Sequence, residues 1–146
     1  MSSRSISIEE AIEQLRLIES QIKQLQSAAT EAELRLAQLS SVESALSRLE
    51  KGSSDVLIPL DSNATVIVAG TVKPLDKVIV HAGLNVFVEV DLGRALNIVR
   101  EERASVSKLL DTYSRELAKL TQYYNALQSA IQQALASSMQ QGYGRR

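Results

Sequence analysis

Residues 55–91 read DVLIPLDSNATVIVAGTVKPLDKVIVHAGLNVFVEVD, and this stretch decides the fold. It is rich in Val and Ile and is broken by three clusters of turn-forming residues. Val- and Ile-rich runs of this length between turn clusters are typical of β-strands. The stretch therefore predicts two β-hairpins, built from strands at residues 55–60, 64–72, 77–82 and 86–90.

Two hairpins of this size are marginally stable alone in water, so the strands need a further surface to pack against. Alternation along the strands gives one fully apolar face and one face that is half apolar. This is more apolar area than a small sheet can hide, so we predict assembly with another copy or a sister chain. The predicted assembly residues on the apolar face are Val66, Val68, Val72, Val78, Val80, Val86 and Val88, with Val90 beside them.

The residues before the strands form one long helical pattern. No Pro or Gly occurs over residues 5–51, and Gly52 stands where a helix C-cap glycine belongs. Ser5 or Ser7 can cap the start, and Glu10 follows Ser7 at the spacing of a capping box. An unbroken heptad register predicts a coiled-coil helix over residues 5–51. Its apolar seam positions are Ile8, Ala11, Leu15, Ile18, Ile22, Leu25, Ala29, Ala32, Leu36 and Leu39.

A second helical pattern covers residues 92–141, and residues 142–146 predict a disordered tail. Its seam positions, broken only by Arg103, are Leu92, Leu96, Val99, Val106, Leu110, Tyr113, Leu117, Leu120, Tyr124, Leu127, Ile131 and Ala134. Two helices of similar length joined by a compact insert predict an antiparallel pair, in which facing residues have numbers that sum to about 143. Glu43, a charge on the first seam, then falls near Arg100 and Arg103. The fold class is therefore α+β: a single domain over residues 1–146, in which two β-hairpins are inserted into a long antiparallel coiled-coil hairpin.

Composition and charge exclude several classes of function. The 146 residues carry a net charge of -1 and no Cys. A charge near zero gives no global attraction to nucleic acid or to an anionic membrane, and the lack of Cys excludes disulfides and thiol chemistry. No apolar run approaches the roughly 18 residues that span a bilayer, and the N-terminus does not read as a signal peptide. We expect a cytoplasmic protein with no nucleic-acid or membrane partner.

Two strand segments, Val-Leu-Ile-Pro-Leu at residues 56–60 and Gly-Leu-Asn-Val-Phe-Val-Glu at residues 83–89, resemble those of the prefoldin family. The first is similar to the family's Val-Leu-Val-Pro-Leu strand. The second is similar to its Gly-x-Gly-Tyr-Tyr-Val-Glu segment, with Asn85 and Val86 as departures. Asn tolerates positive φ, so the turn is retained. Two hairpins rather than one favour the α class, and the low aromatic content and short termini resemble the archaeal type.

The resemblance implies a hexamer of two α-class and four β-class subunits. In it the strands would join in an inter-subunit β-barrel from which the coiled coils extend. The distal ends of the coils would bind unfolded polypeptides and deliver them to a group II chaperonin, without ATP. The resemblance thus implies a chaperone that holds clients, meaning non-native proteins.

No residue pattern in the sequence indicates an enzyme. His81 is the only histidine and has no Cys or carboxylate pair nearby in the sequence, so a plain strand position is favoured over a metal ligand. Glu89 and Asp91 are better read as a solvated edge and a helix N-cap than as an acid–base pair. The glycines match neither nucleotide-binding fingerprint. We expect no catalytic residue, no metal and no cofactor.

One group of apolar residues suggests a binding role in addition to a structural one. Several apolar side chains lie off the seam at the free end of the helical hairpin, where a coiled coil frays. They either widen the seam by packing within the coil or form an apolar surface for unfolded chains. The second interpretation competes with a coiled-coil scaffold or tether that docks one partner. The predicted client-binding tip combines the off-seam residues Ile6, Ile12, Leu135 and Met139 with the seam residues Ile8, Leu15 and Ile131.

Overall fold

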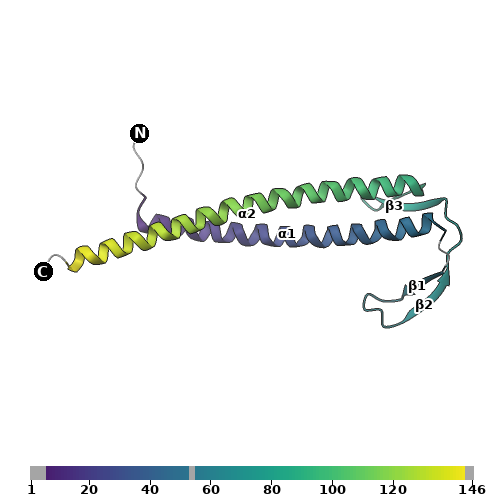
Figure 1. Cartoon of the computed structure of the whole chain (residues 1–146), viewed down its shortest axis with the longest axis horizontal. Helices are drawn as coiled ribbons and strands as arrows, with labels where there is room; N and C mark the ends of the chain where they lie inside the picture. The colour runs from purple at the N-terminus through teal and green to yellow at the C-terminus, as the bar shows by residue number, and fades with distance from the viewer. Residues whose placement is uncertain (1–5, 53–54, 144–146) are drawn as a thin grey trace. The chain divides into compact units, whose positions relative to one another are not determined.

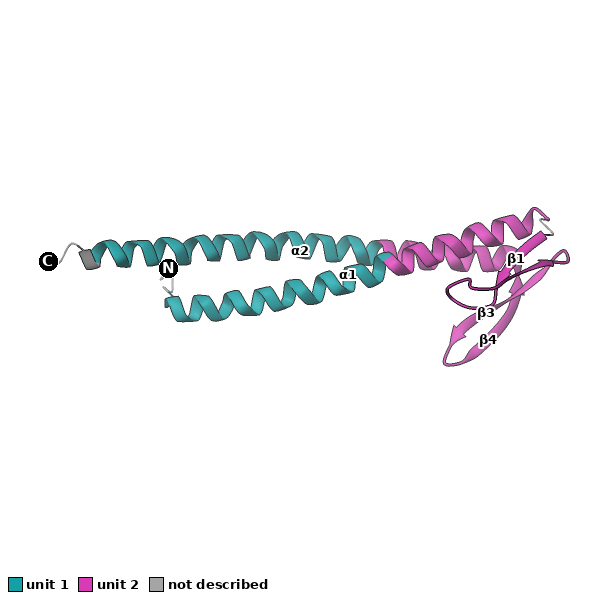
Figure 2. Ribbon diagram, turned by 90° about the horizontal axis from the view of Figure 1, so that it is seen from below, with its two compact units in different colours: residues 1–33, 108–146 teal, residues 34–107 magenta. Residues whose placement is uncertain are grey.

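The computed structural model describes residues 6–52 and 55–143. In chain order the elements are α1 (Ile8–Glu50), β1 (Asp55–Pro59), β2 (Ile67–Thr71), β3 (Lys77–Gly83), β4 (Val86–Asp91) and α2 (Leu92–Tyr143) (Figure 1). The predicted class is confirmed, since two antiparallel strand pairs separate two long helices. Contacts divide the chain into two compact units. The first unit contains residues 1–33 and 108–146, and the second contains residues 34–107 (Figure 2).

The start of α1 is fixed by the capping box that the sequence predicts. The Ser7 amide donates to Glu10 Oε2 and the Glu10 amide donates to Ser7 Oγ, each at 3.2 Å. These two bonds satisfy amides that have no partner inside the helix. The helix therefore begins at Ile8, later than the predicted start at Ser5, which lies outside the described residues. At the other end Gly52 has a φ of 81°, and its amide bonds the Leu49 carbonyl at 3.1 Å.

In the first unit α1 and α2 run antiparallel and pack along a narrow apolar seam. Ala32 is buried in this unit, and Ala11, Ile18 and Leu127 form its buried cluster. Half-buried residues pack around them, and all of these were predicted as seam positions: Leu15, Ile22, Leu120, Tyr124 and Ile131. The heptad spacing of three and four thus identifies which helical residues meet.

The buried side chains of the second unit also lie on the helices. Among the described residues, Leu39 on α1 and Leu92, Ala95 and Leu96 at the start of α2 are buried. No apolar residue of the four strands reaches that level of burial in the described part of the chain. The second unit therefore rests on helix packing, and its strands add little core.

The first hairpin pairs β1 with β2 in the register Val56↔Gly70, Ile58↔Val68 and Pro59↔Ile67. The strand predicted at residues 64–72 was too long, because β2 begins only at Ile67. The preceding residues form a side-chain-locked turn instead: Asp61 accepts from the Thr65 amide and hydroxyl, both at 2.7 Å. These hydrogen bonds, the hydroxyl bond first, lower the pKa of the Asp61 carboxyl.

The second hairpin pairs β3 with β4, with Val78 opposite Val90 and Val80 opposite Val88. Its turn needs left-handed backbone, and Gly83, Leu84 and Asn85 have φ of 95°, 49° and 60°. Gly and Asn adopt such φ values readily, as the sequence predicts. Leu84 adopts one as well, with its side chain 98 % exposed.

Helix α2 continues through Tyr143, so the disordered tail predicted from residue 142 was wrong for residues 142 and 143. The helix passes Gly142 because a single glycine costs only about 1 kcal/mol relative to alanine and no Pro interrupts the run. Residues 144–146 lie outside the described part of the chain.

Seam packing makes a direct prediction for two leucines of α1. Leu39 is 3 % exposed and Leu34 is 61 % exposed. Leu39→Ala should lower the free energy of unfolding by about 2–3 kcal/mol, because it removes buried methyl groups and leaves a cavity. Leu34→Ala should change it by less than about 0.5 kcal/mol. Thermal denaturation followed by circular dichroism measures both, and equal losses would contradict the seam assignment.

Candidate functional site

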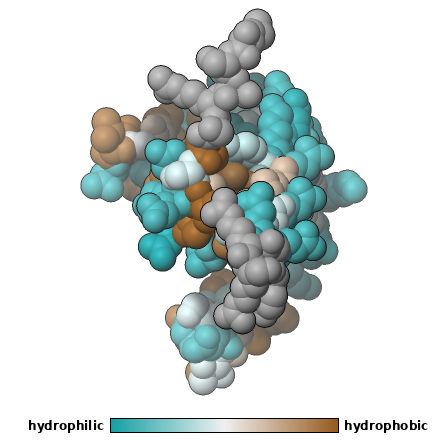
Figure 3. Space-filling model, turned by 90° about the vertical axis from the view of Figure 1, so that its left-hand side faces the viewer, coloured by the Kyte–Doolittle hydropathy of each residue, from teal (hydrophilic) through white to brown (hydrophobic). Residues whose placement is uncertain are grey.

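The apolar tip predicted from the sequence divides into two groups in the structure. Leu15 and Ile131 pack against the buried cluster of the first unit, so they contribute to helix pairing. The other five predicted residues are exposed, with Met139 the most accessible at 69 %: Ile6, Ile8, Ile12, Leu135 and Met139. Ile6 lies two residues before α1, and the others come from the start of α1 and the end of α2. In the view onto this end, hydrophobic residues gather near the middle of the face (Figure 3).

Helix α2 runs past the start of α1 within the first unit (Figure 1). Every residue from Gln132 to Gln141 is exposed, so this part of the helix has no buried face among the described residues. The last seam residue in this region is Ile131, which is half-buried. The end of α2 therefore presents all its sides to solvent.

The strands of the second unit carry a second set of exposed apolar residues. Of the seven predicted assembly residues, Val72, Val78 and Val80 are half-buried within the unit. The rest are exposed, namely Val66, Val68, Val86 and Val88. The opposite face is exposed too, with Leu57 and Ile79 more than 70 % accessible. Apolar surface of this extent is characteristic of contacts between chains.

Glu43 lies between two arginines on the helix seam of the second unit. Arg100 Nε donates to Glu43 Oε1 at 2.9 Å and Arg103 Nη1 donates to Oε2 at 2.5 Å. The pairing predicted from the sequence is confirmed, and the Glu43 side chain is only 18 % exposed. The hydrogen bond from Arg100, together with the positive charges of both arginines, lowers the pKa of the Glu43 carboxyl despite some desolvation.

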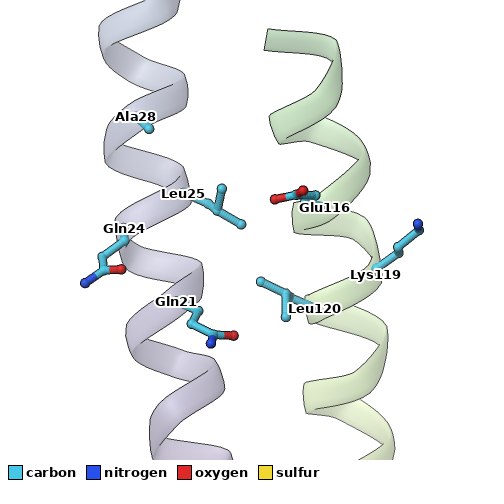
Figure 4. A pocket seen from close by; sticks show the side chains of 7 residues that line it. All are labelled: Gln21, Gln24, Leu25, Ala28, Glu116, Lys119 and Leu120. Carbon is cyan, nitrogen blue, oxygen red and sulfur yellow. The ribbon is translucent and has the colours of Figure 1, made fainter. Parts of the chain in front are cut away.

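An open groove between the helices of the first unit was missed from the sequence. It has a volume of about 570 Å³ and lies beside the seam, with Leu25 and Leu120 directed toward each other across it (Figure 4). Its remaining lining residues are Gln21, Gln24, Ala28, Glu116 and Lys119. A sequence feature that could have indicated this groove is a row of uncharged residues on one face of α1. Gln21, Gln24 and Ala28 form this row, spaced by three and four residues.

Little in the described residues suggests chemistry. No group of three or more metal-ligating side chains gathers in the part of the chain that the structure describes. His81 sits on an exposed strand face, and its ring packs against Phe87 at a centroid distance of 4.9 Å. In the same described part, no helix is both long and apolar enough to cross a membrane. The features with functional potential are the exposed apolar surfaces.

Comparison with known proteins agrees with this arrangement. A family model described as Prefoldin subunit matches residues 13–137. A "Prefoldin subunit alpha" from Hyperthermus butylicus is 57 % identical over 137 residues, covering 94 % of this chain and 89 % of the relative. A second, from Aeropyrum pernix, is 31 % identical and covers 99 % of each chain. The cryo-EM structure of filamentous PFD from Methanocaldococcus jannaschii matches with a TM-score of 0.65 at 23 % identity, over 84 % of this chain and 98 % of that one.

The fold and its exposed surfaces thus define an assembling coiled-coil hairpin of a chaperone family. The chain belongs to the prefoldin family, in the archaeal α class, as the family model and the relatives show.

The Glu43 ion pairs predict a pH-dependent effect on stability. Because the folded-state pKa is lowered, their stabilisation is complete above the ordinary glutamate pKa of about 4.3 and is lost as pH falls through the folded value. Glu43→Gln keeps the side chain's size and leaves Arg100 and Arg103 facing each other without a counter-charge. The variant should melt at a lower temperature than the wild type at pH 7, and the difference should shrink below about pH 4.

Glu19→Gln is the matched control, because it breaks an exposed pair with Lys23 at 3.7 Å. An exposed pair contributes little, so this variant should melt like the wild type at both pH values. A difference in melting temperature between Glu43→Gln and the wild type that persists after the Glu43 carboxyl has been protonated would mean that the carboxylate charge is not its cause.

Proposed function

We propose that this chain is a subunit of a chaperone that holds clients at the coil ends and delivers them to a group II chaperonin without ATP. The observation that carries the proposal is the group of exposed apolar side chains at the open end of the first unit. Soluble chains rarely leave such residues together unless another molecule covers them. Here they also lie at a helix end, where local unfolding is easy and contacts can adapt.

Assembly would use the strands of the second unit. Two isolated hairpins are marginal in water, and both faces of each carry exposed apolar residues. We propose that they join strands of β-class subunits in a β-barrel, in a cytoplasmic complex of two α-class and four β-class chains. The family membership and the exposed strand residues support this arrangement.

Client binding would be weak at each tip and strong for the particle. A few exposed apolar side chains give little affinity to a single site, but several tips on one assembly raise the effective concentration. Met139 suits indiscriminate contact, since an unbranched thioether adapts to many shapes. No nucleotide, metal or other cofactor enters this function, and neither nucleic acid nor membrane is a partner.

The strand surface predicts how assembly is lost. Val68→Asp together with Val88→Asp places charges on two positions that are exposed within the chain, at 44 % and 43 %. The isolated subunit should still fold, because neither side chain is part of its own core. In a β-barrel the two carboxylates would be buried without partners, so sedimentation with the β-class partner should show subunits in place of a hexamer.

Thr71→Asp with His81→Asp is the control, since both residues lie on the opposite, partly polar strand face. This variant should assemble as the wild type does. A hexamer formed by the Val68 and Val88 variant would place the assembly surface elsewhere.

Substitutions in the tip should reduce client binding without reducing the stability of the hexamer. Changing Ile6, Ile12, Leu135 and Met139 to Ser removes side chains that are at least 40 % exposed, so the hexamer should form and melt nearly as before. Suppression of aggregation of a denatured client, measured by light scattering, should fall steeply because the loss is multiplied over the tips. Matching changes in the β-class subunits prevent their tips from masking the effect.

The control changes four exposed apolar residues elsewhere on the helices to Ser, namely Leu17, Leu34, Val42 and Leu109. Client capture should survive this change. Unchanged capture by the tip variant would instead favour a scaffold or tether at the coil ends, with clients bound elsewhere or not at all.

A further inference from the structure

The end of α2 has an unusual composition for an exposed helix. From Leu120 to Gln141 the sequence contains no Asp, Glu, Lys, Arg or His, although charged residues make up 23 % of the chain. Most of the exposed side chains in this neutral segment are amides, hydroxyls or small apolar groups. The ion pair of α2 that lies nearest to it among the described residues joins Arg115 and Asp111, before the segment begins. Ion pairs four residues apart, such as this one, stabilise exposed helices. The absence of charged residues from an exposed helical segment therefore requires an explanation.

The neutral segment is not built to pair with another helix. If the seam continued past Ile131 and Ala134, its next positions would be Ser138 and Gln141, which are polar. A coiled-coil partner requires apolar residues at these positions. The pairing stripe therefore ends before Ser138, with Ile131 as its last half-buried residue, and the residues beyond it are free for other contacts.

A different stripe runs along the exposed side of this segment. Gln128, Gln132, Leu135 and Met139 follow one another at steps of four, three and four, so they share one face of the helix. All four are exposed. The stripe combines two apolar side chains with two amides, each of which both donates and accepts hydrogen bonds. Such a surface can meet apolar side chains and backbone peptide groups of another chain at once.

We infer that the neutral segment of α2 makes client capture indifferent to the charge of the client. This inference rests on the proposed function. It adds that the site does not select its clients by their charge. Every non-native segment exposes backbone N–H and C=O groups, whatever its sequence. Amides satisfy those groups, while Leu135 and Met139 take up apolar side chains. With no charge along the stripe, neither acidic nor basic segments are repelled.

The test compares two clients of opposite charge on the assembled complex. Reduced and carboxamidomethylated α-lactalbumin is an acidic, permanently non-native chain, and lysozyme treated in the same way is a basic one of similar length. The wild-type complex should bind both with dissociation constants within about threefold of each other. Raising salt from about 50 mM to about 500 mM should change either constant by less than about threefold, since no charge pair is screened.

Charges placed on the stripe should create the discrimination that the wild type lacks. Gln128→Lys with Gln132→Lys should bind the acidic client about tenfold more tightly at low salt and the basic client about tenfold more weakly. The corresponding Glu pair should do the reverse, and both differences should vanish at high salt. Lys, Glu and Gln have similar helix propensities, so the helix itself is retained.

Ser40 and Ser44 provide the matched control, because they are exposed, four residues apart and part of the second unit. Lys or Glu at these two positions adds the same net charge and should leave both clients unaffected. Three results would overturn the inference: strong discrimination by the wild type at low salt, unchanged binding by the stripe variants, or an equal effect of the control pair. A wild-type complex that binds neither client would instead overturn the proposed function.

Discussion

The apolar seam between α1 and α2 is the interaction on which the rest of the structure depends. Every buried apolar residue among those described lies on one of the two helices, from Ala11 near the start of α1 to Leu127 on α2. The seam is narrow, because each helix offers only its positions at steps of three and four. The strands add nothing comparable to it. A chain organised in this way keeps its helices paired by itself, and the proposed β-barrel would cover its hairpins with strands of other chains.

The sequence predicted those features that depend on local patterns. The capping box at Ser7 and Glu10, the positive φ at Gly83 and Asn85 and the seam residues all follow from neighbours close in the chain. The ion pairs of Glu43 with Arg100 and Arg103 are a longer-range success. They were predictable because an antiparallel pair of regular helices relates distant residues through a single offset.

The features that differ from the prediction depend on which of several competing interactions is stronger. A pattern of residues does not show which one is. The strand predicted from residue 64 is shortened because the hydrogen bonds of Asp61 to Thr65 hold those residues in a turn. Helix α2 passes Gly142 because its backbone bonds outweigh the preference of one glycine. Leu15 and Ile131 were predicted both as seam positions and as part of the tip, and their packing in the first unit agrees with the seam.

Glu43 and the neutral segment illustrate opposite uses of charge in one pair of helices. Burying a carboxylate on the seam costs solvation, and two arginines offset that cost only in the register that brings them together, so the pair selects one alignment of the helices. A binding surface for many unrelated chains requires the contrary, because each fixed charge would favour some partners and reject others. Charge thus lies where α1 meets α2 at Glu43, and the lack of charge in residues 120–141 of α2 agrees with the unselective client surface proposed above.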